Sequence, residues 1–141
     1  MTIRRLLLLA LVTGLAGTSA ELLLLGHVDG WEQWIPIVLL AGSMVVLIVQ
    51  VRTPTPTTNA ILLGTMWVFL LSGPIGVALH YQGNVEFELE MYPDMQGFEL
   101  IRKTMTGATP VLAPGTMALL GLVGIAYVRA GEAAFRRDGS E

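Results

Sequence analysis

Three glutamates at every second position are the first residues of this chain that call for a chemical explanation. Glu86, Glu88 and Glu90 lie in the stretch GNVEFELEMYP, where they alternate strictly with apolar residues. Alternation with a period of two predicts an extended strand with carboxylates on one face and apolar side chains on the other. Carboxylates on one strand face lie about 6.6–7 Å apart, which is too wide for one tight cation site. The carboxylate face is therefore expected to be solvated or to meet a basic partner.

A lone strand leaves rows of backbone N–H and C=O groups without partners, and the sequence offers no second alternating segment. We expect this segment either to be an irregular, hydrated loop or to pair with another chain. In the second case, backbone hydrogen bonds would supply affinity and the carboxylates would select by charge. The candidate partner-binding residues are Glu86, Phe87, Glu88, Leu89 and Glu90. The apolar residues expected to face the rest of the protein or the membrane surface are Val85, Phe87, Leu89 and Met91.

Glu21 is the single residue that most strongly invites a functional explanation. It lies about five residues, or about 7 Å, inside one end of a long apolar stretch. Ionisable residues in a membrane span are costly and are functional hypotheses by default. One hypothesis is a polar, ligand-binding pocket at the outer leaflet; the other is that Glu21 only reaches the interface or accepts a hydrogen bond from a neighbouring helix. The pocket would contain Glu21, Ser72, His80 and Thr116.

The two histidines are weak candidates for metal ligands. His27 and His80 both fall at predicted outer helix ends, and neutral imidazole together with carboxylate suits zinc or a similar ion. Two histidines from different helices are also a possible haem ligand pair. No pair of ligands spaced by three or four residues supports either site, and interfacial histidines are common. The sequence therefore assigns no cofactor.

Composition excludes several classes of function. The chain has 141 residues and no cysteine, so disulfides, thiolate metal sites and thiol nucleophiles are excluded. It contains no phosphate-binding loop, no G-x-S-x-G and no H-E-x-x-H, so we expect a protein that is not an enzyme. Its 8 basic residues are too few to indicate nucleic-acid binding.

The same composition predicts a membrane protein. Hydrophobic residues make up 53% of the chain and charged residues 13%, about half the charged share of an ordinary soluble domain. The mean hydropathy is +0.66. A helix needs about 20 mostly apolar residues to cross about 30 Å of hydrocarbon. We therefore expect one all-α domain, residues 1–141, built as a four-helix transmembrane bundle. The predicted spans are 6–25, 35–51, 60–79 and 110–128.

Charge asymmetry predicts the orientation of this bundle. Six of the 8 basic residues lie on one side of a four-span topology and two, Arg102 and Lys103, on the other. The positive-inside rule then places both termini in the cytoplasm of a multi-pass protein, which we assign to a bacterial inner membrane. A cleaved signal peptide is the competing interpretation of the N-terminus, but the apolar run continues through 22–25, past the expected cleavage site.

The long connection 81–109 is expected to form an outer cap. It combines the extended acidic segment with a short amphipathic helix, 95–105, lying at the membrane interface. Small residues at helical spacing predict close helix packing within the bundle. These residues are Ala10, Gly14 and Thr18 in the first span, and Ala118, Gly121 and Gly124 in the last.

Two motifs in this region carry a resemblance. LHYQGNVEFELEMYPDMQGFEL and TGATPVLAPGTM, within residues 79–117, resemble a group of uncharacterised small four-span bacterial membrane proteins, with weaker similarity around ELLLLGH. The resemblance implies the same four-helix architecture and assigns no activity to any residue.

These features predict a non-enzymatic integral membrane protein that acts as an accessory or interaction subunit of a larger membrane complex. Its expected partners are the lipid bilayer and other membrane protein subunits. The alternative is a small-ligand or metal-binding membrane protein with a pocket around Glu21 and His80.

Overall fold

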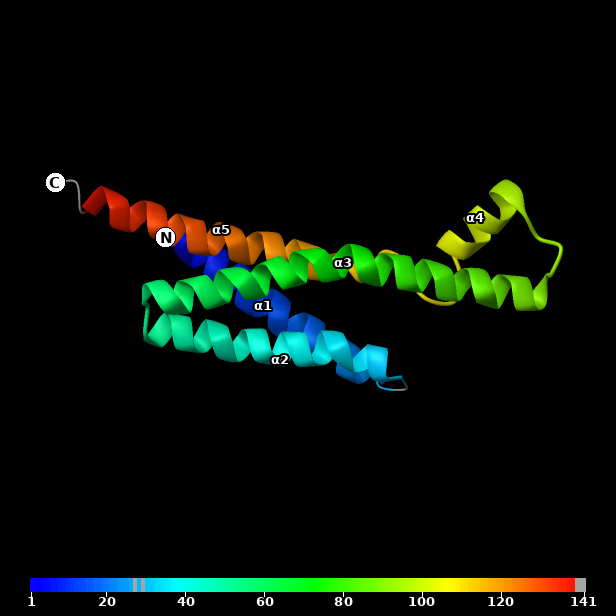
Figure 1. Cartoon of the computed structure of the whole chain (residues 1–141), viewed down its shortest axis with the longest axis horizontal. Coiled ribbons are helices and arrows are strands. Elements are labelled where there is room, and N and C mark those ends of the chain that lie inside the picture. Colours follow the sequence, from blue (N-terminus) through cyan, green and yellow to red (C-terminus); the bar gives the residue numbers. More distant parts are fainter. Residues whose placement is uncertain (27, 29, 139–141) are drawn as a thin grey trace. The chain divides into compact units, whose positions relative to one another are not determined.

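The computed structural model contains helices only in the part of the chain that it describes, residues 1–26, 28 and 30–138. The predicted all-α class is therefore confirmed (Figure 1). The helices are α1 (Ile3–Leu24), α2 (Trp31–Arg52), α3 (Pro56–Met91), α4 (Gly97–Met105) and α5 (Gly115–Asp138).

Four of these helices, α1, α2, α3 and α5, are long and apolar enough to cross a membrane. Many of their large apolar side chains are exposed in the isolated chain, including Val38 at 63% and Leu71 at 62%. Side chains of this kind belong in lipid, where every backbone polar group must also be satisfied within the helix. The chain is thus an integral, multi-pass membrane protein.

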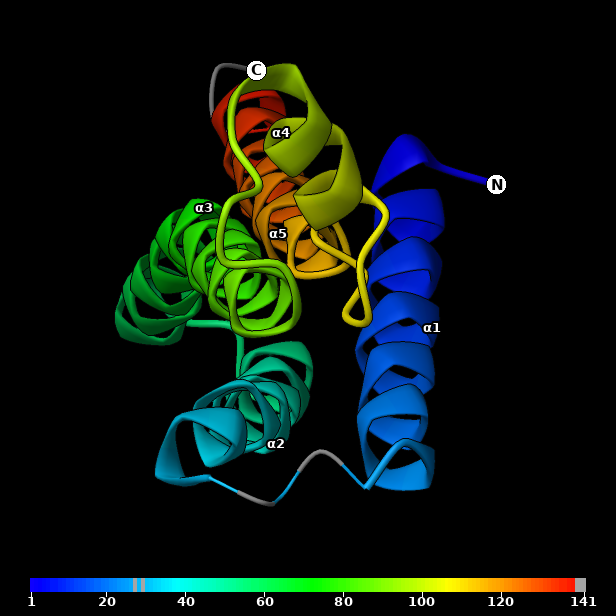
Figure 2. The same cartoon turned by 90° about the vertical axis from the view of Figure 1, so that its right-hand side faces the viewer.

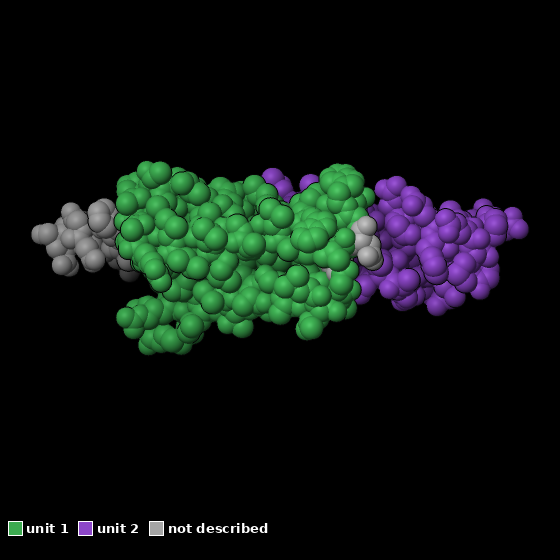
Figure 3. All heavy atoms as spheres, turned by 90° about the horizontal axis from the view of Figure 1, so that it is seen from below, with its two compact units in different colours: residues 1–69, 120–141 green, residues 70–119 purple. Residues whose placement is uncertain are grey.

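The chain divides into two compact units, residues 1–69 with 120–141 and residues 70–119 (Figure 3). In the first unit, α2 and the beginning of α3 run in opposite directions beside each other (Figures 1 and 2). Buried side chains recur every three or four residues, as an apolar stripe on a helix requires. They are Leu11, Leu15, Leu40, Leu47, Leu62, Met66, Phe69, Leu120, Tyr127 and Val128.

Small residues mark contacts between helices of the first unit, as their spacing predicts. A side chain added at Gly14 would meet Leu120 of α5, and one added at Gly124 would meet Met66 of α3. The obstructing atoms are side-chain atoms that can move. These two seams are therefore internal to the protein.

A chain of hydrogen-bonded polar side chains joins four helices of the first unit, and no local sequence pattern predicts it. Arg4 donates a hydrogen bond of 3.4 Å to the Tyr127 hydroxyl and lies 5.1 Å from the centre of its ring. The Tyr127 hydroxyl donates to Gln50 Oε1 at 2.9 Å, and Gln50 Nε2 donates to Asn59 Oδ1 at 2.9 Å. Gln50 and Tyr127 are 1% and 2% exposed, so these bonds replace water that burial excludes.

We expect Tyr127→Phe to lower the free energy of unfolding by about 1–2 kcal/mol, because Gln50 Oε1 then loses its buried donor. Thermal unfolding in mild detergent measures the loss. Tyr81→Phe is the matched control, since the Tyr81 hydroxyl has no hydrogen bond among the described residues. Equal melting temperatures for the two variants would contradict a stabilising role for the polar chain.

The predicted extended acidic segment is wrong, because α3 continues as a helix to Met91. One side of α3 is buried at intervals of three or four residues, at Leu62, Met66, Phe69 and Gly73. Asn84 and Glu88 are buried on the same side of the helix, about three and four turns after Gly73. A helix satisfies its own backbone groups, whereas a lone strand of seven residues has no partner. Glutamate, leucine and methionine also favour helix, and Gln82 bonds Glu86 at 3.0 Å one turn away.

The other boundaries differ less from prediction. The last span begins as a helix at Gly115 and not at residue 110, because a turn occupies 111–114 between two prolines. The N-cap of α3 is Thr55, whose Oγ1 accepts from Thr58 N at 3.1 Å, while Thr58 Oγ1 accepts from Thr55 N at 2.9 Å. Pro74 lies inside α3, which continues through it.

Candidate functional site

Helix α3 is longer than a membrane span requires. Its 36 residues span about 54 Å, whereas the hydrocarbon core is about 30 Å thick. The apolar stretch 60–79 accounts for one membrane thickness, and the polar residues begin at Gln82. We therefore expect residues 82–91 of α3 to lie beyond the hydrocarbon. Together with the turn 92–96 and α4, they form what we call the extramembrane hairpin.

Close helix contacts hold α3 against the start of α5 in the second unit. A Cβ built on Gly73 would lie 2.6 Å from Ala118 Cβ and 2.8 Å from the Ala118 backbone nitrogen. A Cβ on Gly76 would lie 2.6 Å from Pro114 Cβ. Only glycine permits this approach, so the base of the hairpin is set by backbone packing.

Asn84 closes the hairpin through both ends of its amide. Its Nδ2 donates to the Thr104 carbonyl oxygen at 2.9 Å and to the Thr109 carbonyl oxygen at 2.8 Å. Its Oδ1 accepts from Thr109 N at 3.1 Å and from Thr109 Oγ1 at 2.6 Å. Asn84 is 2% exposed, so one buried side chain ties α3 to the end of α4 and to the following loop.

Further contacts fix the loop between α4 and α5. A Cβ on Gly107 would lie 2.9 Å from the Asn84 amide, so glycine gives the loop room to pass. His80 Nδ1 lies 3.1 Å from the Pro110 carbonyl oxygen. In the tautomer that carries its proton on Nδ1, His80 donates a hydrogen bond to this oxygen. Thr104 is fully buried, and its hydroxyl has no hydrogen-bond partner within the described part of the chain.

The glutamates and apolar residues that alternate in the sequence point in different directions around α3, because the segment is a helix. They are not divided between two faces as they would be in a strand. Glu88 is 8% exposed and shares the buried face with Asn84. Glu86 and Glu90 are exposed one turn apart, and Leu89 is half-buried. Phe87 and Met91, expected to face the rest of the protein or the membrane surface, are 46% and 54% exposed in the isolated chain, so the rest of the chain does not cover them.

The predicted amphipathic helix is present as α4, and the rest of the chain does not cover its apolar side. Phe98, Ile101 and Met105 lie on one side and are 79%, 49% and 42% exposed. The neighbouring side, with the half-buried Leu100 and the buried Thr104, packs inward. The chain itself thus leaves this apolar stripe of α4 uncovered.

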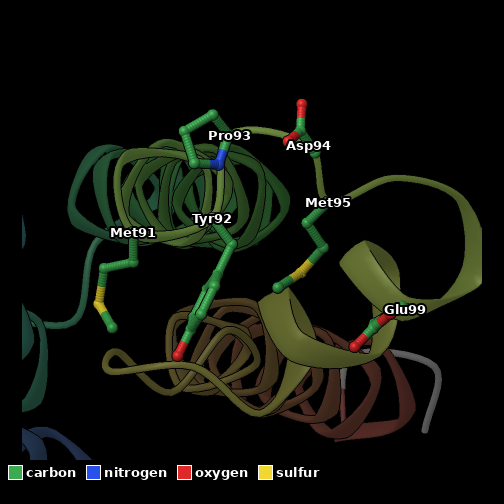
Figure 4. A pocket seen from close by; sticks show the side chains of 6 residues that line it. All are labelled: Met91, Tyr92, Pro93, Asp94, Met95 and Glu99. Atoms are coloured by element: carbon green, nitrogen blue, oxygen red, sulfur yellow. The ribbon is translucent and has the colours of Figure 1, made fainter.

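The turn between α3 and α4 contains an open hollow of about 370 Å³. Figure 4 shows the side chains of Met91, Tyr92 and Met95 pointing to the same side of the turn, with Glu99 of α4 across from Met95. Pro93 and Asp94 complete the lining, and Asp94 points away from the other side chains (Figure 4). Gly97 has a φ of 65°, a conformation that glycine adopts without strain and that lets the chain enter α4.

The residues of the predicted polar pocket differ in their exposure and belong to both compact units. Glu21 is exposed on α1 in the first compact unit. Ser72 and His80 are half-buried on α3, and Thr116 is exposed on α5, all in the second unit. His27 lies outside the described residues. Among the described residues, no group of three or more His, Cys, Asp or Glu is placed to hold a metal ion.

Nothing in the local sequence around Asn84, Thr104 and Thr109 predicts that they hold the hairpin closed. One signal was available: Asn84 lies 11 positions after Gly73, three helical turns along the same face. The partners of Asn84 lie 20 and 25 residues away, and no local pattern indicates them. No protein-family model, curated protein or solved structure matches this chain.

Proposed function

We propose that this protein is a non-enzymatic accessory subunit that docks a larger membrane complex through its extramembrane hairpin. The observation that carries the proposal is the uncovered apolar stripe of α4, Phe98, Ile101 and Met105, on a hairpin locked by buried hydrogen bonds. A rigid hairpin with exposed large side chains loses little conformational entropy when a partner covers it.

The hairpin's position relative to the membrane supports the same role. Its last α3 turns extend beyond the hydrocarbon, so lipid tails do not cover Phe98 at the far end. Exposed clusters of aromatic and aliphatic side chains mark surfaces that bind a protein partner or a membrane, and aromatic residues are enriched where proteins bind proteins. The four spans then serve as the anchor that keeps the hairpin at the membrane surface.

Native-gel migration in mild detergent tests this role. We expect the wild-type chain to migrate with its partner complex and Phe98→Ser/Ile101→Ser to migrate alone, with unchanged thermal unfolding. Leu112→Ser is the matched control, because Leu112 is 67% exposed but lies outside the hairpin. If the double variant keeps the wild-type migration, the docking role is wrong.

We further propose that both termini are cytoplasmic and the hairpin faces outward, on the six-to-two distribution of basic residues. The chain has no native cysteine, so single cysteines report accessibility cleanly. In intact cells, a membrane-impermeant maleimide should label Gln96→Cys and leave Thr55→Cys unlabelled until the cells are permeabilised. The reverse pattern would overturn this orientation.

A further inference from the structure

We infer that the partner segment seated on the extramembrane hairpin is cationic and amphipathic, and that it places a lysine or arginine side chain in the hollow at the α3–α4 turn. This inference rests on the docking role proposed above and adds the chemistry of the partner. Three features of the hairpin carry it: charge, exposed apolar surface, and the lining of the hollow.

The charge of the hairpin tip is entirely negative. Residues 86–99 contain five carboxylates and no lysine, arginine or histidine. Those at Glu86, Glu90, Asp94 and Glu99 belong to exposed residues. Within the described part of the chain, the one ion pair joins Arg129 to Glu132, so Arg102 and Lys103 form no ion pair with the carboxylates of the tip. The carboxylates of the tip repel one another, and a positively charged partner would reduce that repulsion. The same charge would attract the partner toward the tip as it approaches.

Apolar side chains are interspersed with these carboxylates. Phe87, Met91, Tyr92 and Phe98 are 46%, 54%, 50% and 79% exposed. A purely polar cation would leave them in water, whereas an amphipathic segment covers them and meets the carboxylates with its charged residues. The tip therefore selects a segment that carries both kinds of side chain.

The hollow has the lining that a long basic side chain requires. Met91 and Met95 offer apolar surface to its methylene groups, and Tyr92 adds an aromatic ring that can take part in a cation–π contact. The Glu99 carboxylate, across the hollow from Met95 (Figure 4), can accept a charge-assisted hydrogen bond from the cationic head.

Other occupants fit these features less well. An anionic membrane surface is repelled by the carboxylates of the tip. A second copy of this hairpin brings Arg102 and Lys103 but also five more carboxylates, so its net charge is again negative. A lone metal ion would leave the apolar side chains uncovered.

A peptide titration of the full chain in detergent micelles tests the inference. The probe is the amphipathic peptide Lys-Leu-Leu-Lys-Leu-Leu-Lys, and its control has glutamate in place of each lysine. An environment-sensitive fluorophore on Gln96→Cys reports binding at the turn, and the same fluorophore on Thr55→Cys reports adsorption to the micelle. We expect a saturable response to the lysine peptide at position 96 alone, which salt weakens.

Neutralising the exposed carboxylates with Glu86→Gln/Glu90→Gln/Asp94→Asn/Glu99→Gln should weaken lysine-peptide binding by about tenfold or more. Glu21→Gln/Glu32→Gln, which removes carboxylates elsewhere, should bind as the wild type does. Equal binding of both peptides, no response to the lysine peptide, or full binding by the neutralised variant would each overturn the inference. The docking role would still stand if Phe98→Ser/Ile101→Ser alone loses the native complex, so the two failures are distinguishable.

Discussion

Asn84→Leu should release α4 from α3 while leaving the membrane spans folded. The substitution removes four hydrogen bonds, one to the carbonyl oxygen of the buried Thr104 and three partly buried ones to Thr109. A hydrogen bond contributes about 0.5–1.5 kcal/mol and a buried group left unsatisfied costs about 1–3 kcal/mol, so we expect a local loss of about 3 kcal/mol or more. Hydrogen–deuterium exchange of residues 97–105 measures it directly, because local opening sets the exchange rate.

Gln82→Leu is the matched control for this variant. It also replaces an amide side chain with leucine, two residues earlier on α3, where the exposed amide bonds only the exposed Glu86 side chain. Exchange in 97–105 should stay at the wild-type rate in Gln82→Leu. If Asn84→Leu also keeps the wild-type rate, Asn84 does not hold the hairpin closed.

Gly73→Ala should destabilise the second compact unit, whereas Gly64→Ala on the same helix should not. The new methyl group at position 73 would lie 2.8 Å from the Ala118 backbone nitrogen, which cannot move away as a flexible side chain can. Overpacking of this kind costs about 1–3 kcal/mol. At Gly64 nothing lies within 4 Å, and alanine there gains up to about 1 kcal/mol of helix propensity.

The two substitutions are expected to change stability in opposite directions, so comparing them isolates the effect of packing. Thermal unfolding in detergent should rank the melting temperatures as Gly73→Ala below wild type, and Gly64→Ala at or above it. If the two alanine variants melt together, the packing of α3 against the start of α5 is not close enough to require glycine.

The transmembrane architecture was predictable because long apolar runs have only one common solution in lipid. The four apolar runs required no knowledge of tertiary contacts, and each overlaps a long helix, although α3 continues to Met91 and α5 begins only at Gly115. Glycine at positions 14 and 124 also indicated seams that the fold contains. These features depend on local composition, which the sequence displays directly.

The conformation of residues 83–91 was not predictable from the same kind of pattern. Seven residues that alternate between polar and apolar fit the period of a strand. The buried side of the helix includes the polar residues Asn84 and Glu88, so its apolar pattern cannot be recognised in the sequence. What makes this face buried is α4, whose contact through Thr104 lies 20 residues further along the chain. The polar chain from Arg4 to Tyr127 is hidden for the same reason, since 123 residues separate its members.

The rate at which a thiol at position 98 reacts in native membranes tests the docking role most directly. Phe98 is 79% exposed in the isolated chain, and Ala108, also exposed, lies on the loop beyond the hairpin. If a partner covers the apolar stripe of α4, Phe98→Cys reacts slowly with a maleimide in native membranes and quickly in liposomes that hold only this protein. Ala108→Cys should react at similar rates in both. Equal rates for Phe98→Cys in the two membranes would contradict the account.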